Sequence, residues 1–480
     1  MSNLKQLRAP ANDFRNEDVR PVRNRPPTAM IRESLNSRYD TALAAVESRT
    51  CHSWKMALDR SKVMISAPNL GGTQTPQVIV QSAEGCRITD IDDNVYIDLC
   101  MGFGSNLLGH APPVVEHAII NQIHQGWNFG LSSETQLELA DLIGTAGPAN
   151  ERVLFCAAGS EATAIAMRAA RAHTGKDVIG VFDGAYHGGH DSVLITADSH
   201  NPGKKVHIGM GVPDALDETV EPLPYGSFKA LQRIRDLKHT LAAVIVEPIQ
   251  QSFPDSDGGL WLKDLEKTCR DCNVLIILDE ITTGFRLAFG GGQERFDLSP
   301  DMVTYGKAVA GGLPAGVLAG RANIMKVFSP DNGQPAVFAG SAFAGNPLSV
   351  AASLATLSYL NDHRDTVYEN LEKSAEYFAN SVNKHWLENK IPLHIVRFGS
   401  MLRLFLQPGP AKRDRNIGQG TGSIEDAFFV HLLDRGVTLH ASRSIHLSTS
   451  NTREDIDISI DAMIGASEDC AADGLFRVAM

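Results

Sequence analysis

Short apolar runs alternate with longer amphipathic segments through the middle of the chain. Helical patterns lie at 161–173, 228–239 and 260–272. The apolar runs are rich in Val and Ile, and they predict strands at 152–155, 177–182, 242–246, 274–278 and 302–305. Strands that are apolar throughout and alternate with helices favour an α/β fold, with a mostly parallel sheet between helices.

The two ends of the chain follow other patterns. Residues 78–98 predict a small antiparallel meander that turns at Asp92-Asp93-Asn94. From about 345 the pattern is helical, and it continues through 371–387. Shorter alternating segments at 393–398, 402–405 and 445–448 precede a final helix from Thr452. These segments predict a smaller α+β terminal domain.

Four parts of the chain follow from this division. They are an N-terminal arm (1–60), the first part of the small domain (61–114), the large domain (115–345) and the C-terminal part of the small domain (346–480). A helical pattern begins within the arm and covers residues 34–62. The stretch 408–423, rich in Gly, Pro and charge, is expected to be a mobile loop.

Composition limits the classes of function. The net charge of −12 argues against a nucleic-acid partner, and seven scattered cysteines do not suggest a disulfide framework. No apolar run reaches the roughly 18 residues of a membrane span, and the N-terminus lacks the apolar core of a signal peptide. We therefore expect a cytoplasmic protein. No metal site is predicted, because neither His187 with His190 nor Cys269 with Cys272 has further ligands at a suitable spacing.

Ligands of parallel sheets bind at the carboxyl ends of the strands, so the residues that follow each strand are the candidates. Gly159 and Ser160 open a helix after the first strand and could bind an anion, although Ser160 could equally be a simple helix cap. Tyr186 and His187 lie in a glycine-rich loop after the second strand. This loop could approach a flat ligand, or it could carry only a surface tyrosine.

Two charged residues stand at the ends of later strands. Asp279 ends a buried run and needs a cationic or N–H partner, which a helix cap or a structural ion pair would also supply. Lys307 is the one charged residue in the stretch 304–316, which has four glycines. Desolvation there would lower its pKa and make its amine available for a Schiff base, although a simple loop lysine is the alternative. Together these candidates match the binding of pyridoxal 5′-phosphate (PLP).

The chain from about residue 78 to 465 resembles the class III, fold-type I PLP-dependent aminotransferases. The resemblance is to the branch that contains glutamate-1-semialdehyde aminomutase and the β-amino-acid aminotransferases. It rests on these segments: Asp90 to Asp98, Leu108-Gly109-His110, Gly159 to Ala162, Gly184 to Gly188, Val246-Glu247-Pro248, Leu278-Asp279-Glu280, Gly306-Lys307, Gly340-Ser341 and Gly345-Asn346-Pro347.

The resemblance implies a role for each matching residue. Lys307 would carry the cofactor as a Schiff base and then act as the base. Asp279 would keep the ring nitrogen protonated, and Ile281 would pack on the ring face opposite Tyr186. Backbone N–H groups of Gly159 and Ser160 would bind the phosphate.

Further residues complete the implied cofactor site. Ser341 matches a threonine that reaches the phosphate of the neighbouring subunit, which implies a homodimer with active sites at the interface. Glu247 and Gln250 would lie near the ring hydroxyl, with His187 beside Tyr186. Phe103 matches a tryptophan in the substrate entry region of the aminomutase.

The chain also departs from the family pattern. Ala157-Ala158 replace an Asn-Ser pair, so one phosphate-binding hydroxyl is lost. The C-terminal Phe-Glu segment of the aminomutase is absent. Arg443 in that region is similar to an arginine of the β-amino-acid aminotransferases that can face the substrate carboxylate, although a solvated surface arginine is the alternative.

The first functional hypothesis is therefore an aminotransferase. It would move an amino group between an α- or β-amino carboxylate and an oxo acid by a ping-pong mechanism. The second is an aminomutase of the glutamate-1-semialdehyde type that uses the same residues and needs no second substrate. An epimerase or decarboxylase is third. A regulatory protein that only senses an amine is disfavoured, because residues 1–60 are too polar and too interrupted by proline for a DNA-binding domain.

Overall fold

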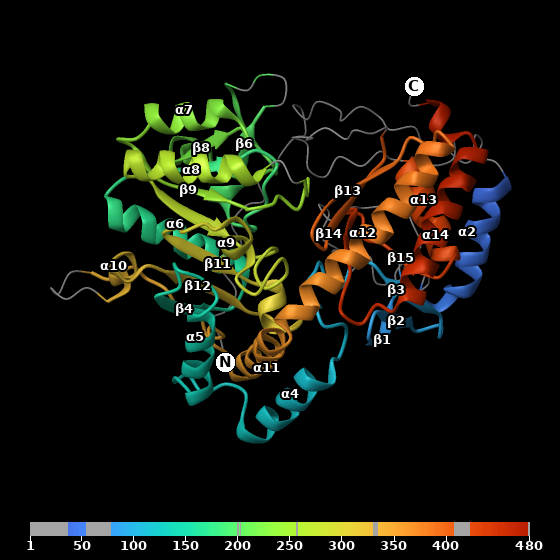
Figure 1. Cartoon of the computed structure of the whole chain (residues 1–480), viewed down its shortest axis with the longest axis horizontal. Helices are drawn as coiled ribbons and strands as arrows, with labels where there is room; N and C mark the ends of the chain where they lie inside the picture. Colours follow the sequence, from blue (N-terminus) through green and yellow to red (C-terminus); the bar gives the residue numbers. More distant parts are fainter. Residues whose placement is uncertain are drawn as a thin grey trace, which may run out of the picture.

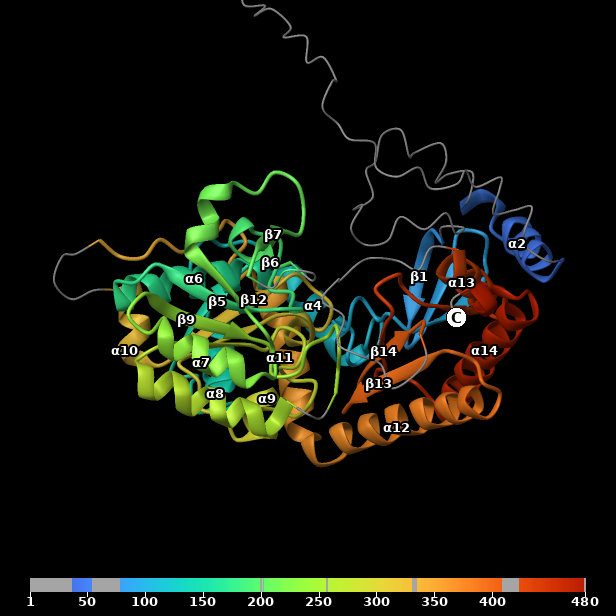
Figure 2. The ribbon, with the colours of Figure 1, turned by 90° about the horizontal axis from the view of Figure 1, so that it is seen from above.

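The computed structural model describes residues 37–53, 78–198, 201, 203–255, 258–329, 335–407 and 423–478. The chain forms two lobes, and the long helix α12 (Arg364–Glu388) runs from one to the other (Figures 1 and 2). The expected loop at 408–423 lies almost wholly outside the described residues, as does most of the N-terminal arm.

A seven-stranded sheet forms the larger lobe. Its strands lie in the order β4-β12-β11-β10-β9-β5-β8. β12 is antiparallel to both of its neighbours, and the other pairs are parallel. The strands are β4 (Arg152–Cys156), β5 (Val178–Phe182), β8 (Val220–Leu223), β9 (Leu241–Val246), β10 (Leu275–Asp279), β11 (Met302–Tyr305) and β12 (Gly316–Gly320).

Helices cover both faces of this sheet because its strands are apolar on both sides. In β9, which is buried throughout, Val244 and Val246 belong to one core cluster, whereas Ala243 and Ile245 belong to another. The second cluster includes α6 (Gly159–Thr174). The first includes residues of α4 (Pro113–Gln125), α5 (Glu134–Gly144), α7 (Phe228–Asp236), α8 (Gly258–Cys272) and α11 (Pro347–Asp362).

The core of the larger lobe extends into the first half of α12. Val367 and Leu371 belong to its core, whereas Ala375 and the later buried residues of α12 belong to the core of the smaller lobe. α11 also packs against α4 and α5 of the larger lobe. The domain limits given above remain predictions.

Two small sheets and several helices form the other lobe. One sheet has the order β1-β2-β3-β15 and the other β13-β14-β16. The N-terminal helix α2 packs against α13 and α14 on the outside of this lobe (Figure 1). The elements are α2 (Ser37–Arg49), β1 (Val80–Glu84), β2 (Arg87–Asp90), β3 (Val95–Asp98), β13 (His394–Phe398), β14 (Met401–Phe405), α13 (Ser423–Asp434), β15 (Val437–Thr438), β16 (Ser444–His446) and α14 (Arg453–Ala472).

The sequence pattern predicted most of these elements. All five predicted strands of the large sheet are present, and the predicted mostly parallel α/β architecture is confirmed. The pattern missed β8, β12 and the hairpin of β6 (Ile195–Ala197) and β7 (Lys205–His207). Within the described ranges, no helix is both long and apolar enough to cross a membrane.

Candidate active site

Lys307 is the second residue after β11, at the edge of the sheet where the parallel strands end. Its backbone is in the left-handed region, with φ of 47°, which is unusual for a residue with a side chain. Its Nζ donates hydrogen bonds to Thr282 Oγ1 at 2.6 Å and to Gln251 Oε1 at 3.0 Å. Burial lowers the pKa of Lys307 to about 8, and the nearby carboxylates of Glu247 and Asp279 oppose this shift. A usable fraction of free amine is therefore present near neutral pH.

Asp279 ends the neighbouring strand β10 and is 3 % exposed. The partner that a buried carboxylate requires is His187, whose Nδ1 lies 2.6 Å from Asp279 Oδ2. Asp279 Oδ1 accepts hydrogen bonds from the Ile281 N–H at 3.1 Å and from Thr304 Oγ1 at 3.2 Å. The carboxylate is thus held in one orientation and paired to a histidine.

Glu247 supplies a second buried carboxylate beside this pair. It directly follows β9, and its Oε2 accepts a hydrogen bond from the N–H of Tyr186 at 3.3 Å. Burial raises the pKa of Glu247 to about 7, and the charge of Asp279 adds to the shift while His187 and Lys307 oppose it. Glu247 therefore takes up or loses a proton near neutral pH. Tyr186 itself is 62 % exposed, so its ring lies at an open side of the site.

The N-terminus of α6 forms the third part of the site. The first N–H groups of a helix lack acceptors within it and favour an anion. A Cβ on Gly159 would lie 2.7 Å from Ile281 Cδ1, and one on Gly188, where φ is 116°, would lie 2.6 Å from Ser160 Oγ. Ser160 Oγ also accepts a hydrogen bond from the Gly189 N–H at 3.3 Å. Because these glycines lack a Cβ, the helix terminus and the neighbouring loop can approach each other closely.

The replaced pair Ala157-Ala158 leaves this terminus without a side-chain cap. Ala158 is the N-cap residue and offers no oxygen, while the Ala157 N–H donates to Glu161 Oε2 at 2.6 Å. The acidic side chain of Glu161 thus satisfies one N–H just before the helix, and the N–H groups of Gly159 and Ser160 face no side-chain cap.

Gln250 and Ser341 make hydrogen bonds to the backbone of loops. The Gln250 amide is 2 % exposed and donates from Nε2 to the Asp183 carbonyl at 2.9 Å, which anchors the turn before Tyr186. Ser341 is exposed and accepts a hydrogen bond from the Phe343 N–H at 3.4 Å.

The predicted substrate residues lie on the smaller lobe's side of the molecule. Phe103 has φ of 57° and packs edge-on against His440 with ring centroids 4.6 Å apart. Arg443 has φ of 61°, and its side chain is 14 % exposed. Its Nε lies 3.8 Å from Glu425 Oε1, so an acid already faces the guanidinium.

Several residues of the site were missed by the sequence reasoning. Gln251, Thr282 and Thr304 fix the Lys307 amine or the Asp279 carboxylate, yet single amide and hydroxyl residues follow no pattern in a sequence. Their position directly after, or next to the end of, a strand that already carried a candidate is the one signal that could have found them.

Arg286 is a buried residue after β10 that is not among the predicted site residues. It is 1 % exposed and lies within the chain core. Its NH2 group donates to the Gly104 carbonyl at 2.9 Å, and its NH1 group donates to the Leu447 carbonyl at 3.1 Å. Among the described residues no carboxylate pairs with it. Arg286 thus connects the turn that carries Phe103 to the segment after β16.

Pyridoxal phosphate fits these residues. The amine, the buried carboxylate and the helix N-terminus meet at one edge of one sheet, and the glycines at 159 and 188 leave room where a Cβ would clash. The fold and this site place the protein among the fold-type I PLP-dependent enzymes. Lys307, Asp279 and the start of α6 would hold the aldehyde, the ring nitrogen and the phosphate, respectively.

The family is shown by comparison with known proteins. The model of the class III aminotransferases matches residues 70–461, and the chain belongs to this family. Its cofactor is pyridoxal phosphate. The resemblance inferred from the motifs is thereby confirmed.

Curated relatives bear the name of one branch. Glutamate-1-semialdehyde 2,1-aminomutase from Methanococcoides burtonii is 34 % identical over 422 residues, which is 85 % of this chain and 98 % of the relative. The enzyme of the same name from Archaeoglobus fulgidus is 33 % identical over 427 residues, 85 % of this chain and 99 % of the relative.

The solved structures that are similar to this chain include aminotransferases as well as an aminomutase. A β-phenylalanine aminotransferase from Variovorax paradoxus is 25 % identical, with a TM-score of 0.78 over 91 % of this chain and 98 % of the other. A glutamate-1-semialdehyde aminomutase from Pseudomonas aeruginosa has a TM-score of 0.81 over 92 % and 99 %, and at 22 % identity it shows the shared fold.

Proposed function

We propose that the protein moves an amino group within one small amino carboxylate, in the manner of a glutamate-1-semialdehyde 2,1-aminomutase. The observation that carries this proposal is the match to relatives of that name at 33–34 % identity over 85 % of the chain. The geometry supports amino-group chemistry in general, because the Lys307 amine has a pKa of about 8 and lies beside a paired carboxylate.

When bound, pyridoxal phosphate would supply an electron sink for the carbon that carries the amino group. Lys307 would hold the cofactor through its Nζ. Once released, this Nζ would move protons between the substrate carbons and the cofactor as the amino group changes position. Thr282 and Gln251 accept hydrogen bonds from Nζ at 2.6 and 3.0 Å, and these bonds would fix the position of the amine during the transfer.

Asp279 and His187 would serve the ring nitrogen of the cofactor. The Asp279 carboxylate would hold a proton there, and His187 and Thr304 fix the orientation of that carboxylate. Glu247, with a pKa raised to about 7 by burial, lies beside the pair and adds negative charge above neutral pH.

A second candidate is transfer between two molecules, the aminotransferase of the first hypothesis. It is supported by likeness to a β-phenylalanine aminotransferase at 25 % identity and by Arg443, which could bind a substrate carboxylate. Glu425 lies 3.8 Å from that guanidinium, so a substrate would have to compete with it. In this reaction an oxo acid accepts the amine.

We also propose a homodimer. Exposed apolar side chains lie in the region from α4 to α5 and near Ser341. They are Trp127 (60 % exposed), Leu131 (83 %), Leu137 (63 %) and Phe343 (61 %). The Asn346 side chain donates to the Trp127 carbonyl at 2.7 Å, which joins the two segments. A partner subunit would cover these side chains and bring a second Ser341 to each site.

One experiment separates the two reactions. The PLP-loaded protein is incubated with glutamate-1-semialdehyde alone, and the products are separated by chromatography and identified by mass spectrometry. An isomer of unchanged mass, formed without an oxo acid, supports the mutase. Turnover of α- or β-amino acids that requires an oxo acid and obeys ping-pong kinetics supports the aminotransferase. Lys307→Ala must abolish either reaction, and failure to do so would contradict both.

A further inference from the structure

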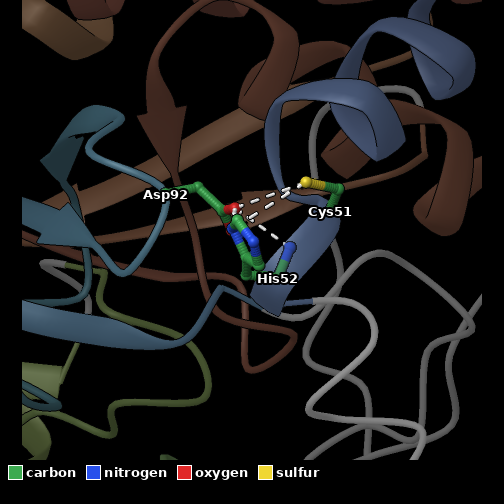
Figure 3. A group of neighbouring side chains, drawn as sticks. All are labelled: Cys51, His52 and Asp92. Carbon is green, nitrogen blue, oxygen red and sulfur yellow. Dashed lines mark hydrogen bonds and ion pairs between the residues drawn. The ribbon is translucent and has the colours of Figure 1, made fainter.

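A cysteine, a histidine and an aspartate meet on the smaller lobe, outside the PLP site. Cys51 and His52 lie in the helical turn that follows α2, and Asp92 lies in the turn between β2 and β3 (Figure 3). Their donor atoms lie within 4.8 Å of one another. The three residues offer a thiol sulfur, a ring nitrogen and a carboxylate oxygen, which is a donor set that zinc binds.

The distances approach those of a tetrahedral site. Cys51 Sγ lies 3.9 Å from His52 Nδ1 and 3.7 Å from Asp92 Oδ1, while Nδ1 and Oδ1 are 2.7 Å apart. Bond lengths to zinc of about 2.0–2.3 Å at tetrahedral angles require separations of about 3.4–3.6 Å. The two separations that involve Sγ are therefore close to the required length. The separation between Nδ1 and Oδ1 must increase by about 0.7 Å, which happens when the metal replaces the hydrogen bond between His52 and Asp92.

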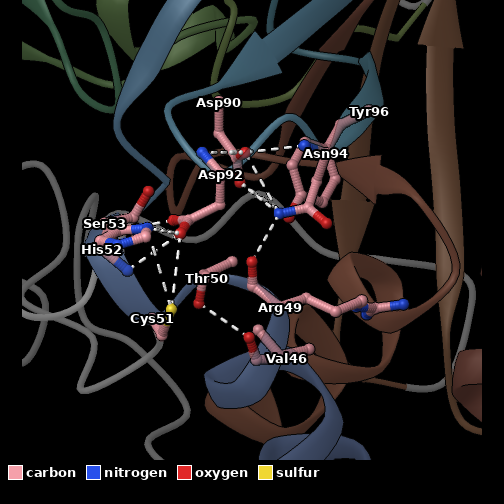
Figure 4. A network of polar contacts seen from close by, with 10 residues as sticks. All are labelled: Val46, Arg49, Thr50, Cys51, His52, Ser53, Asp90, Asp92, Asn94 and Tyr96. Atoms are coloured by element: carbon pink, nitrogen blue, oxygen red, sulfur yellow. Dashed lines mark hydrogen bonds and ion pairs between the residues drawn. The ribbon is translucent and has the colours of Figure 1, made fainter.

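Asp92 is already held in place for this role. The turn that carries it is fixed by Asp90, whose Oδ1 accepts the N–H groups of Asp92 and Asn94 at 2.9 and 2.8 Å (Figure 4). The Asp92 side chain is 5 % exposed. The N–H groups of His52 and Ser53 donate to Oδ1 and Oδ2 of Asp92, each at 2.9 Å, and hold the carboxylate in one orientation.

The donor atoms have room to rearrange around a metal. Asp92 Oδ2 can keep its hydrogen bond to the Ser53 N–H at 2.9 Å while Oδ1 turns to a metal. The His52 side chain is 75 % exposed, so its ring can rotate and water can reach a fourth coordination position.

We propose that Cys51, His52 and Asp92 form a site for zinc or a similar divalent transition metal, with water as the fourth ligand. The metal would fasten α2 to the turn between β2 and β3, two parts of the chain that the Asn94 side chain already joins by donating to the Arg49 carbonyl at 2.8 Å (Figure 4). Its role is structural, and it is independent of the reaction at Lys307.

Cobalt(II) is the probe for the test, because tetrahedral cobalt with a thiolate ligand absorbs in the red, away from PLP. The full-length, PLP-loaded protein is freed of metal with a chelator and titrated with cobalt. We expect one cobalt per chain, and zinc should displace it. Cys51→Ser should weaken binding by more than about 100-fold, since even outer-shell partners of metal ligands contribute 10- to 100-fold.

Matched variants complete the experiment. Cys272→Ser removes another partly exposed thiol and should leave cobalt binding unchanged. Lys307→Ala should bind cobalt as the wild type does, so a failed PLP assignment would not affect the result. Zinc should raise the unfolding temperature of the wild type and not that of Cys51→Ser. Absence of the red absorption, or equal binding by Cys51→Ser, would overturn the proposal.

Discussion

Replacement of Arg286 by lysine tests whether this buried arginine positions the active site. The guanidinium donates to the Gly104 and Leu447 carbonyls, which belong to segments far apart in the sequence. Lysine keeps the charge, but its single ammonium cannot reach both carbonyls in the fork geometry of arginine. One hydrogen bond from a charged donor is worth about 1.5–3 kcal/mol, so Arg286→Lys should lower the free energy of unfolding by about 2 kcal/mol.

The catalytic effect follows from the turn that Arg286 holds. Met101 and Phe103 have φ of 47° and 57°, which is strained for residues with a side chain, so this turn needs external support. With the contact to Gly104 weakened, Phe103 should lose its fixed position. We expect kcat/KM to fall about tenfold or more, as small displacements of positioning groups cost up to 100-fold.

The assay combines urea unfolding of the PLP-loaded protein with steady-state kinetics. The kinetics use the substrate that is turned over in the incubation with glutamate-1-semialdehyde or with amino acids and an oxo acid. Arg295→Lys is the control, because Arg295 is half-exposed and pairs with Glu372 at 3.1 Å. That change should alter the stability by less than about 0.5 kcal/mol. If Arg286→Lys were as stable and as active as Arg295→Lys, the positioning role would be refuted.

Three further predictions concern the cofactor site. The rate at which apoenzyme takes up PLP should rise with pH and reach half of its maximum near pH 8, because the Lys307 pKa is lowered to about 8 and the neutral amine reacts. Glu247→Gln removes a charge that raises this pKa, so the midpoint measured by stopped-flow absorbance should move to lower pH. Gly188→Ala should weaken PLP binding about tenfold in a fluorescence titration. The new Cβ would lie 2.6 Å from Ser160 Oγ, and a φ of 116° costs a residue with a side chain about 1–2 kcal/mol. Gly189→Ala is the control and should bind PLP normally, because a Cβ there would have no atom within 4 Å. His187→Phe removes the 2.6 Å contact to Asp279, so kcat should fall at least tenfold while the PLP content, measured by absorbance, changes little; an unchanged kcat would contradict the role of the pair.

Apolar strands could be predicted because burial on both faces leaves a continuous hydrophobic run. β9 is such a strand, and all six of its residues are buried. β12 was missed because its five residues begin and end with glycine, which indicates a loop. β8 was missed because Pro222 interrupts it.

The chemistry of the site was predictable where one residue carried a strong signal. Lys307 stands alone among uncharged residues, and the need of Asp279 for a partner was evident from the strand before it. That the partner is His187 could not be derived, because the two residues are brought together by the pairing of strands far apart in the chain. The trio of Cys51, His52 and Asp92 was missed for the same reason.

The single reversed strand of the large sheet has a consequence for how the protein is made. Among the described strands, β4 is the first of this sheet to leave the ribosome, and its one partner there is β12, the last. Until β12 is synthesised, β4 has no hydrogen-bonding neighbour, and the helix terminus that would bind phosphate is not joined to the strand before Lys307. Cofactor capture must therefore wait until the whole sheet has emerged. During that interval β4 is an exposed edge that a chaperone would have to protect from aggregation.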